Sequence, residues 1–168
     1  MHNPFLWPGN HSITCYSSFM EQLYSIPAKL LSPVLLVLIL LMLSTILVFS
    51  YLRKVEGFNP SLLVGCTVCA LLIPSVSHDY ALSFLAAPVV TLLCLVRPNE
   101  AGAPVSRIGQ KVAVLIISFA YFSTVFSVFN KPAPTVLFSL ATPMLILILL
   151  ATVALFVMDK ENERHQGS

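Results

Sequence analysis

Five long apolar segments follow one another along this chain and constrain its fold more than any motif does. They cover residues 33–52, 61–73, 81–96, 112–129 and 136–158. The first has 20 residues without a charged side chain, about the length at which an α-helix crosses a bilayer core of roughly 30 Å. Charged residues make up 10% of the sequence, whereas soluble domains carry roughly a quarter. We therefore predict an all-α integral membrane protein, a bundle of about five transmembrane helices.

The nine basic residues are distributed unevenly among the stretches that join these segments. If the loop containing Arg53 lies in the cytoplasm, seven basic residues lie on that side and only Lys29 and Lys131 lie outside. Because cytoplasmic loops carry an excess of Lys and Arg, we predict a multi-pass protein of the plasma (inner) membrane. Its N-terminus would lie outside and its C-terminus in the cytoplasm. The net charge of +2 is small and dispersed, which argues against a nucleic-acid partner.

With this topology the chain divides into three parts. Residues 1–31 are expected to form a loop and an interfacial helix on the outer face. Residues 32–158 form the transmembrane region, in which 61–73 and 81–96 are short for a crossing. Residues 159–168 form a charged cytoplasmic tail.

Residues 13–26 have the spacing of a short amphipathic helix, which Asn10 or Ser12 could cap. Six apolar residues recur at helical intervals, and four polar residues fall on the other side. The apolar residues are Ile13, Tyr16, Phe19, Met20, Leu23 and Tyr24, and the polar ones are Ser17, Ser18, Glu21 and Gln22. The segment is too polar to cross the bilayer, so we expect it to lie at the membrane interface.

The start of the chain does not resemble a secretory signal, because no Lys or Arg precedes Lys29. A polar outer stretch without a signal is natural for the back half of a larger polytopic protein. We expect such a fragment, and a genuine five-span protein is the alternative.

The predicted topology gathers three polar stretches on the outer face, at residues 10–12, 75–80 and 130–131. Ionisable residues at membrane depth are costly and usually face a cavity or a partner. On a turn, His78 and Asp79 can converge on one ligand, such as a sugar, a phosphate group or a metal ion. The alternative is a solvated turn whose Asp79 caps the next helix.

A metal site or a redox site has less support from the sequence than a ligand-binding turn at residues 75–80. A metal site needs three or more ligands, and few candidates lie on the outer face, so we predict no metal and no cofactor. Cys66 and Cys69 have the spacing of a redox or metal pair but lie inside an apolar segment without a second pair. We interpret them as packing residues of a transmembrane helix.

Two short stretches resemble motifs of glycosyltransferase family 87, which includes polyprenol-phosphate-mannose-dependent mannosyltransferases. Residues 10–13, Asn-His-Ser-Ile, resemble the family's Asn-Gln-Ser-Leu element. Residues 73–80, Ile-Pro-Ser-Val-Ser-His-Asp-Tyr, resemble its later Ser-Pro-x-Ser-Trp-Asp-His segment and the His-Asp-Tyr variants of that segment. The order and approximate spacing agree, and the resemblance covers essentially the whole chain as the C-terminal part of the family's length.

The resemblance implies a GT-C type fold, in which a helix bundle opens a lateral groove for a polyprenyl-phosphate-linked sugar donor. A hexose, mannose by resemblance, would pass to a glycan or lipid acceptor on the extracytoplasmic side. The family's general base would lie before Met1, so no catalytic residue is assigned in this chain. The predicted substrate-binding residues are Asn10, His11, Ser12, Ser77, His78, Asp79, Tyr80 and Lys131.

A second hypothesis belongs to another class. The chain could be a non-enzymatic polytopic membrane protein, either half of a transporter or a membrane assembly subunit. A transporter would be expected to show a broken-helix site near the middle of the bilayer, and Pro74 and Pro88 leave that open.

Overall fold

The computed structural model of the chain describes residues 10–52, 58–74, 82–95, 104–129 and 138–166, with side chains in the last two ranges described for 108–125 and 141–158. All regular elements in these ranges are helices, so the predicted all-α fold is confirmed for the described part. The helices are α1 (Ile13–Tyr24), α2 (Ala28–Leu52), α3 (Pro60–Leu72), α4 (Ser83–Leu95), α5 (Pro104–Phe129) and α6 (Phe138–Gln166).

Three of these helices contain a stretch that is long and apolar enough to cross a membrane. The stretches are Ala28–Leu52 in α2, Ile108–Val125 in α5 and Ala141–Met158 in α6. The helices α3 and α4 are also apolar, but each has only 13 residues. At 1.5 Å per residue such a helix rises about 20 Å, against roughly 30 Å for a bilayer core. The apolar helices indicate a membrane protein, whereas five crossings are not confirmed.

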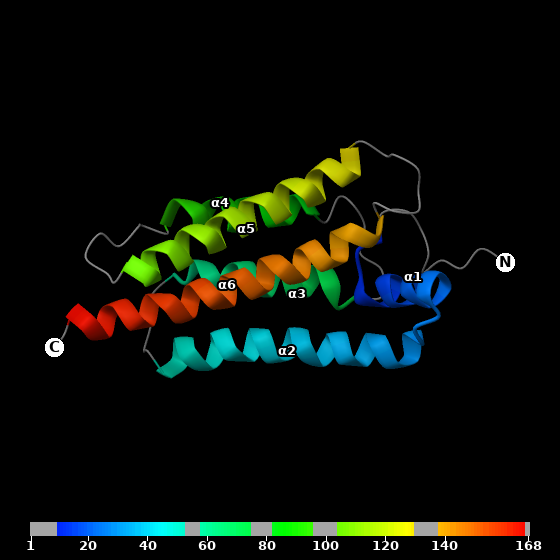
Figure 1. Cartoon of the computed structure of the whole chain (residues 1–168), viewed down its shortest axis with the longest axis horizontal. Helices are drawn as coiled ribbons and strands as arrows, with labels where there is room; N and C mark the ends of the chain where they lie inside the picture. The colour runs from blue at the N-terminus through cyan, green and yellow to red at the C-terminus, as the bar shows by residue number, and fades with distance from the viewer. Residues whose placement is uncertain (1–9, 53–57, 75–81, 96–103, 130–137, 167–168) are drawn as a thin grey trace.

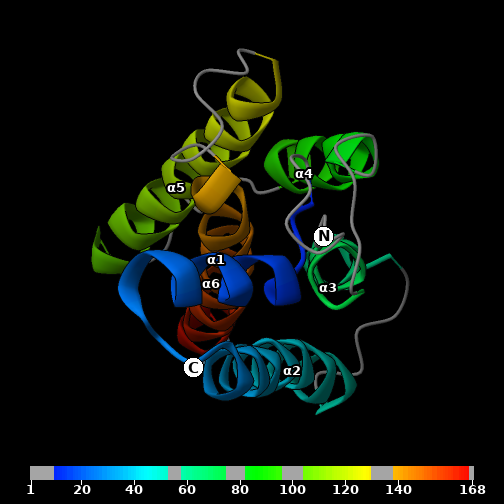
Figure 2. The same ribbon diagram turned by 90° about the vertical axis from the view of Figure 1, so that its right-hand side faces the viewer.

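The bundle is built around α6. Figure 2 shows α6 at the centre, with α2, α3, α4 and α5 around it. Half of the apolar stretch of α6 is buried, against 11% of that in α2. Apolar helices with little buried surface in the protein are typical of helices that face lipid, so α2 has the character of a peripheral transmembrane helix.

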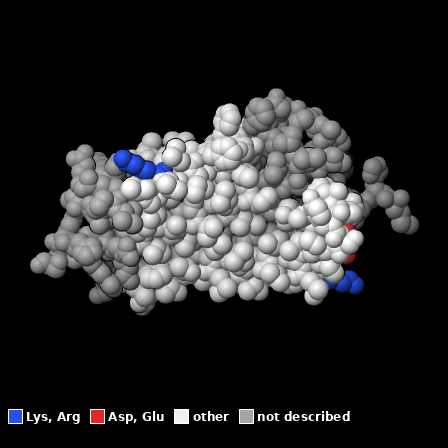
Figure 3. Space-filling model, viewed as in Figure 1, with Lys and Arg blue, Asp and Glu red and all other residues white. Residues whose placement is uncertain are grey.

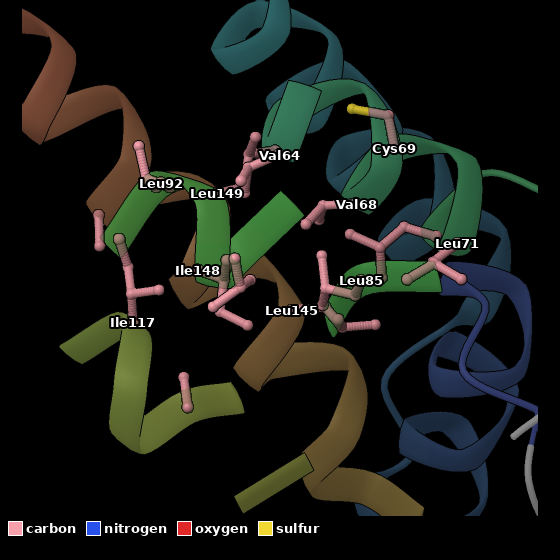
Figure 4. Packing of buried hydrophobic residues seen from close by; sticks show 14 of the residues in the cluster. Val64, Val68, Cys69, Leu71, Leu85, Leu92, Ile117, Leu145, Ile148 and Leu149 are labelled. Carbon is pink, nitrogen blue, oxygen red and sulfur yellow. The ribbon is translucent and has the colours of Figure 1, made fainter. Parts of the chain in front are cut away.

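Apolar residues at helical spacing form the core between these helices. In α3, Val64, Val68 and Leu71 are buried, and in α4, Leu85 and Leu92 are buried. These side chains point toward Leu145, Ile148 and Leu149 of α6 and toward Ile117 of α5 (Figure 4). Residues three, four and seven positions apart share one helix face, which explains why short helices such as α3 and α4 can still pack on α6.

The helix α1 lies across one end of the bundle (Figures 1 and 2). It ends at Tyr24, two residues before the predicted boundary, because Ser25 adopts a left-handed conformation with φ of 56°. The backbone N–H of Ser25 donates to the carbonyl of Glu21 at 3.0 Å, which closes the helix. Pro27 then leads into α2, in which the N–H groups of Leu30 and Leu31 donate to the Pro27 carbonyl.

The helix α5 starts earlier than the sequence pattern predicted. The apolar segment predicted here covers residues 112–129, but the helix begins at Pro104. Gln110 is buried at 3% exposure and continues a heptad-like face with Ala113, Ile117 and Ala120. Small residues on this face allow α5 to approach α6 closely.

Candidate functional site at the α1 end of the bundle

The end of the bundle that α1 crosses, called the α1 end below, contains the described part of the predicted site. The helices α2, α4 and α6 run away from this end, whereas α3 and α5 run toward it (Figure 1). Of the predicted site residues, the structure describes the three in the segment Asn10-His11-Ser12. The others, Ser77, His78, Asp79, Tyr80 and Lys131, lie outside the described residues.

All three residues of the segment Asn10–Ser12 are buried, at 3%, 2% and 0% exposure. Ser12 is the N-cap of α1, and its Oγ accepts from the backbone N–H of Cys15 at 3.2 Å. The Oδ1 of Asn10 accepts from the backbone N–H of Ser12 at 3.1 Å, which closes an Asx turn. The sequence predicted that one of these two residues would cap the helix, and Ser12 does.

His11 connects the segment to the central helix. Its backbone carbonyl accepts from Thr142 Oγ1 at 3.1 Å, a contact between residues 131 positions apart in the chain. Thr142 lies in the second turn of α6 and is itself buried at 1% exposure. The Nδ1 atom of the His11 imidazole is buried as well. The start of α1 is therefore fixed against α6, and a titratable ring is held inside the protein.

The buried face of α1 differs from the face that its apolar residues predicted. Ser17, expected on the polar side, is fully buried, and its hydroxyl donates to the carbonyl of Ile13 at 2.7 Å. Leu23 and Tyr24, expected on the apolar side, are exposed by 54% and 66%. A serine that bonds its own helix can enter a packed interface, so the contact of α1 with the bundle is made by its first half.

Partial burial also raises the pKa of the Cys15 thiol in the first turn of α1. The pKa rises from 9.0 to about 11, because desolvation disfavours the thiolate. The pKa of Tyr16 is raised too, first by desolvation and then by the neighbouring Tyr24. Neither group is therefore ionised near neutral pH, and neither has the character of a nucleophile.

The described charged side chains lie toward the two ends of the molecule. Figure 3 shows acidic and basic atoms of the described residues near the α1 end and basic atoms near the opposite end, with uncharged surface between them on the described part of this face. The charged residues whose side chains are described are Glu21, Lys29 and Lys111. Such a band without charges is what a bilayer core requires. The described charges therefore lie at the ends of the apolar helices and not along their middle.

The described residues do not assemble a metal site. No group of three or more His, Cys, Asp or Glu side chains comes together in the part of the chain that the structure describes. Cys66 is exposed and Cys69 is buried in the hydrophobic core, and both are free thiols. The place of Cys69 in the core agrees with the interpretation as a packing residue.

The hydrogen bonds at the α1 end hold backbone in place. Asn10 Oδ1 accepts from the N–H of the cap residue Ser12, Ser12 Oγ accepts from an N–H in the first turn of α1, and Thr142 donates to a backbone carbonyl. These bonds hold His11 inside the protein and fix the start of α1 at this end of the bundle. Chemistry that breaks a bond would need groups beyond these three residues.

Thr142 is the residue of this site that the sequence did not reveal. It lies in an apolar run, as Thr45 and Thr152 do, and those two hydroxyls bond carbonyls of their own helices at 2.8 Å. Nothing in the local pattern distinguishes a threonine that contacts a distant segment from one that bonds its own helix. Thr142 bonds a distant segment because the start of α1 packs beside it on α6.

The chain was compared with protein-family models, with curated proteins and with solved structures, and no significant match was found in any of the three comparisons.

Proposed function

We propose that this chain is the C-terminal part of a membrane glycosyltransferase. It would transfer a hexose, mannose by resemblance, from a polyprenyl-phosphate-linked donor to a glycan or lipid acceptor on the extracytoplasmic side. The observation that carries the proposal is the burial of Asn10-His11-Ser12 at the α1 end, because this segment is the described part of the family-like motifs. Polar residues buried at a membrane boundary usually serve a ligand or a partner.

The surface near Asn10–Ser12 suits a donor that has a long isoprenoid chain and a polar phosphate-sugar head. The nearby helix α2 exposes most of its apolar surface, including Leu30 and Val34 in its first two turns. An isoprenoid chain could lie along such a surface while its phosphate and sugar reach the α1 end. In the proposed topology the α1 end faces outward, and the opposite end, with Lys111, faces the cytoplasm.

The proposed reaction is glycosyl transfer with inversion at the anomeric carbon. A base outside this chain would remove the proton of the acceptor hydroxyl, whose oxygen attacks the anomeric carbon while the lipid phosphate leaves with the bonding pair. The developing charge on the phosphate requires hydrogen-bond donors or cations. In this chain, His11, His78 and Lys131 are the candidates for that role, and Asn10 and Ser12 fix the position of His11.

Donor binding tests the proposal without requiring turnover. The chain in lipid nanodiscs is exposed to a photoreactive polyprenyl-phosphate mannose, and covalent capture is measured with and without excess unlabelled donor. We expect saturable capture that His11→Ala lowers at least about tenfold, which corresponds to about 1.4 kcal/mol of binding free energy.

A second substitution controls for folding. His11→Gln introduces the residue that the family motif carries at this position, so it should keep most of the capture. All variants are compared by thermal unfolding, so that loss of binding is separated from loss of structure. Capture that does not saturate, or that is equal in wild type and in a folded His11→Ala variant, would contradict the proposal.

A non-enzymatic polytopic membrane protein is the second candidate. The observation that favours it is the hydrogen bonding at the α1 end, in which Asn10, Ser12 and Thr142 act on backbone groups. If these residues only stabilise the fold, His11→Ala should lower the unfolding temperature, and the chain should capture no donor. The same experiment therefore distinguishes the two candidates.

A further inference from the structure

Exposed apolar side chains continue along the chain from the end of α1 into α2. Leu23 and Tyr24 lie at the end of α1, Ile26 lies in the turn, and Leu30 and Val34 lie in the first two turns of α2; all five are exposed. The two helices also pack on each other, so these side chains belong to one region of the surface, called the α1–α2 corner below (residues 23–34). Proteins seldom expose so many large apolar side chains together unless another molecule covers them.

The backbone fixes the angle of this corner. Ser25 adopts its left-handed conformation at the end of α1, and its N–H donates to the Glu21 carbonyl. On the other side of the turn, the N–H groups of Leu30 and Leu31 donate to the Pro27 carbonyl. As a result, α1 lies across the end of the bundle while α2 runs along it (Figures 1 and 2). A membrane that α2 crosses along its length therefore has α1 in the plane of its surface.

The polarity of the chain changes sharply within the corner. Glu21, Gln22 and Lys29 are exposed before the change, whereas residues 30–52 contain no charged side chain. The 25 residues of α2 rise about 37 Å, more than the roughly 30 Å of a bilayer core. The first turn of α2 therefore reaches the level of the lipid headgroups when the apolar remainder of the helix fills the core.

We propose that the α1–α2 corner binds the headgroup region of a phospholipid bilayer. Leu23, Tyr24 and Ile26 enter the layer in which headgroups meet acyl chains, and the ammonium group of Lys29 donates to lipid phosphates. The occupant is lipid, because the corner is continuous with the exposed apolar face of α2, a helix long and apolar enough to cross a membrane. The inference goes beyond the proposed function, because it applies equally to an enzyme and to a non-enzymatic membrane protein.

The side chains of the corner have the chemistry that this layer requires. Tyrosine is enriched at membrane–water interfaces, because its ring is apolar and its hydroxyl is polar. Lysine can lay its aliphatic stem along apolar surface while its ammonium group stays among the headgroups. The first half of α1, in which Ile13 and Ser17 are buried, is held by the protein instead. The helix thus contacts protein with one half and lipid with the other, whereas the sequence predicted that the whole segment would lie at the interface.

Fluorescence quenching by brominated phospholipids tests the inference in vesicles of phosphatidylcholine and phosphatidylglycerol. Trp7→Phe removes the single tryptophan of the chain, and Tyr24→Trp then introduces a reporter in the corner. We expect bromine near the lipid headgroup to quench this reporter at least about twofold more strongly than bromine near the end of the acyl chain. Leu41→Trp, at an exposed position in the middle of α2, should show the opposite preference.

Three other results at Tyr24→Trp would overturn the inference. A reporter that only aqueous acrylamide quenches lies in water, and one that bromine near the chain ends quenches most strongly lies in the bilayer core. A reporter that neither quencher reaches is covered by protein, such as a second copy of the chain. Thermal unfolding shows that each variant is folded, and Leu23→Trp, with the same expected preference, replaces Tyr24→Trp if that variant is not.

Charge reversal tests the role of Lys29 separately. Lys29→Glu places a carboxylate against the lipid phosphates, so it should lower the quenching of the Tyr24→Trp reporter by headgroup-level bromine at least about twofold. Lys111→Glu, toward the opposite end of the molecule, is the matched control and should leave the quenching unchanged. Equal quenching in the two variants would show that Lys29 does not contact the headgroups.

Discussion

Several threonine hydroxyls in the described helices donate to backbone carbonyls, and the position of the carbonyl decides what each bond contributes. The hydroxyls of Thr45, Thr124 and Thr152 donate to carbonyls one turn back in their own helices, each at 2.8 Å. Thr142 differs from these three, because its hydroxyl donates to the carbonyl of His11 in another segment. A hydroxyl that adds a second bond to an occupied helical carbonyl contributes little, whereas one that satisfies a distant carbonyl fixes tertiary structure.

We therefore expect Thr142→Val to destabilise the protein by about 1–2 kcal/mol, because a buried carbonyl loses its donor. Thermal unfolding of the purified protein in detergent measures the effect. Thr152→Val is the control, since Thr152 lies on the same helix, is equally buried and bonds only Ile148 in the described structure. The role of Thr142 would be refuted by equal unfolding temperatures for the two variants.

Ser25 is the one described non-glycine residue with a positive φ, at 56°. Left-handed backbone crowds the Cβ of an L-residue, and glycine avoids this crowding. Ser25→Gly should therefore raise the stability by about 0.5–1 kcal/mol. The same exchange at Ser18, inside α1, should lower the stability by about 0.5 kcal/mol.

The two serine variants are compared by thermal unfolding under the same conditions. We expect Ser25→Gly to raise the unfolding temperature and Ser18→Gly to lower it. A loss of stability at both positions would mean that Ser25 contributes through its side chain rather than through the turn.

At the scale of whole helices, α3 is the element that joins the peripheral α2 to the central α6. Gly65 makes this possible: a Cβ added there would meet Ile46 Cδ1 at 3.1 Å, Leu43 Cδ1 at 3.5 Å and Leu149 Cδ1 at 3.7 Å. The first distance is tight and the others are ordinary contacts, so a methyl group could be accommodated by small shifts, but a longer side chain could not. Small residues set helix distance in membranes because lipid provides no hydrophobic force between helices.

Gly65→Leu should accordingly destabilise the bundle by about 1–3 kcal/mol, through overpacking between α2 and α6. The neighbouring Cys66→Leu is the control, because Cys66 is exposed on the outer side of α3 and a leucine there would face lipid. Thermal unfolding in detergent or nanodiscs measures both. Tolerance of leucine at both positions would show that α2 is not packed on α3 through Gly65.

For the whole molecule, the prediction concerns its orientation in the membrane. Crossing by α2, α5 and α6 alone and crossing by all five apolar helices would each place the α1 end and the C-terminal end of α6 on opposite sides of the membrane. The positions of the basic residues predict the cytoplasm for the side with Arg53 and Lys111. The orientation thus does not depend on how α3 and α4 sit.

Reporters fused to Met1 and to Ser168 should therefore be detected on opposite sides of the membrane, the second in the cytoplasm. A protease-accessibility assay on intact cells provides the measurement, with a cytoplasmic marker as the control for leakage. Reporters on the same side would require an even number of crossings and would overturn the topology.

The sequence by itself determined the helical fold, the character of the apolar segments and most helix positions. Helix periodicity and hydropathy are local properties, so 61–73 and 81–96 were recognised as short, and α3 and α4 match them to within two residues. The sequence also identified Ser12 as a candidate cap, because capping needs only neighbouring residues.

Only the tertiary structure decided which faces are buried and which distant residues meet. Ser17 lies inside and Tyr24 outside although their polarity predicted the reverse, because the first half of α1 is inserted beside α6 while its second half projects from the bundle. The bond between Thr142 and His11 spans 131 positions, and no local pattern encodes it. Hydropathy ranks residues by their affinity for an apolar environment, but in a membrane both lipid and protein interior are apolar. The choice between them is therefore made by packing, which depends on the whole bundle.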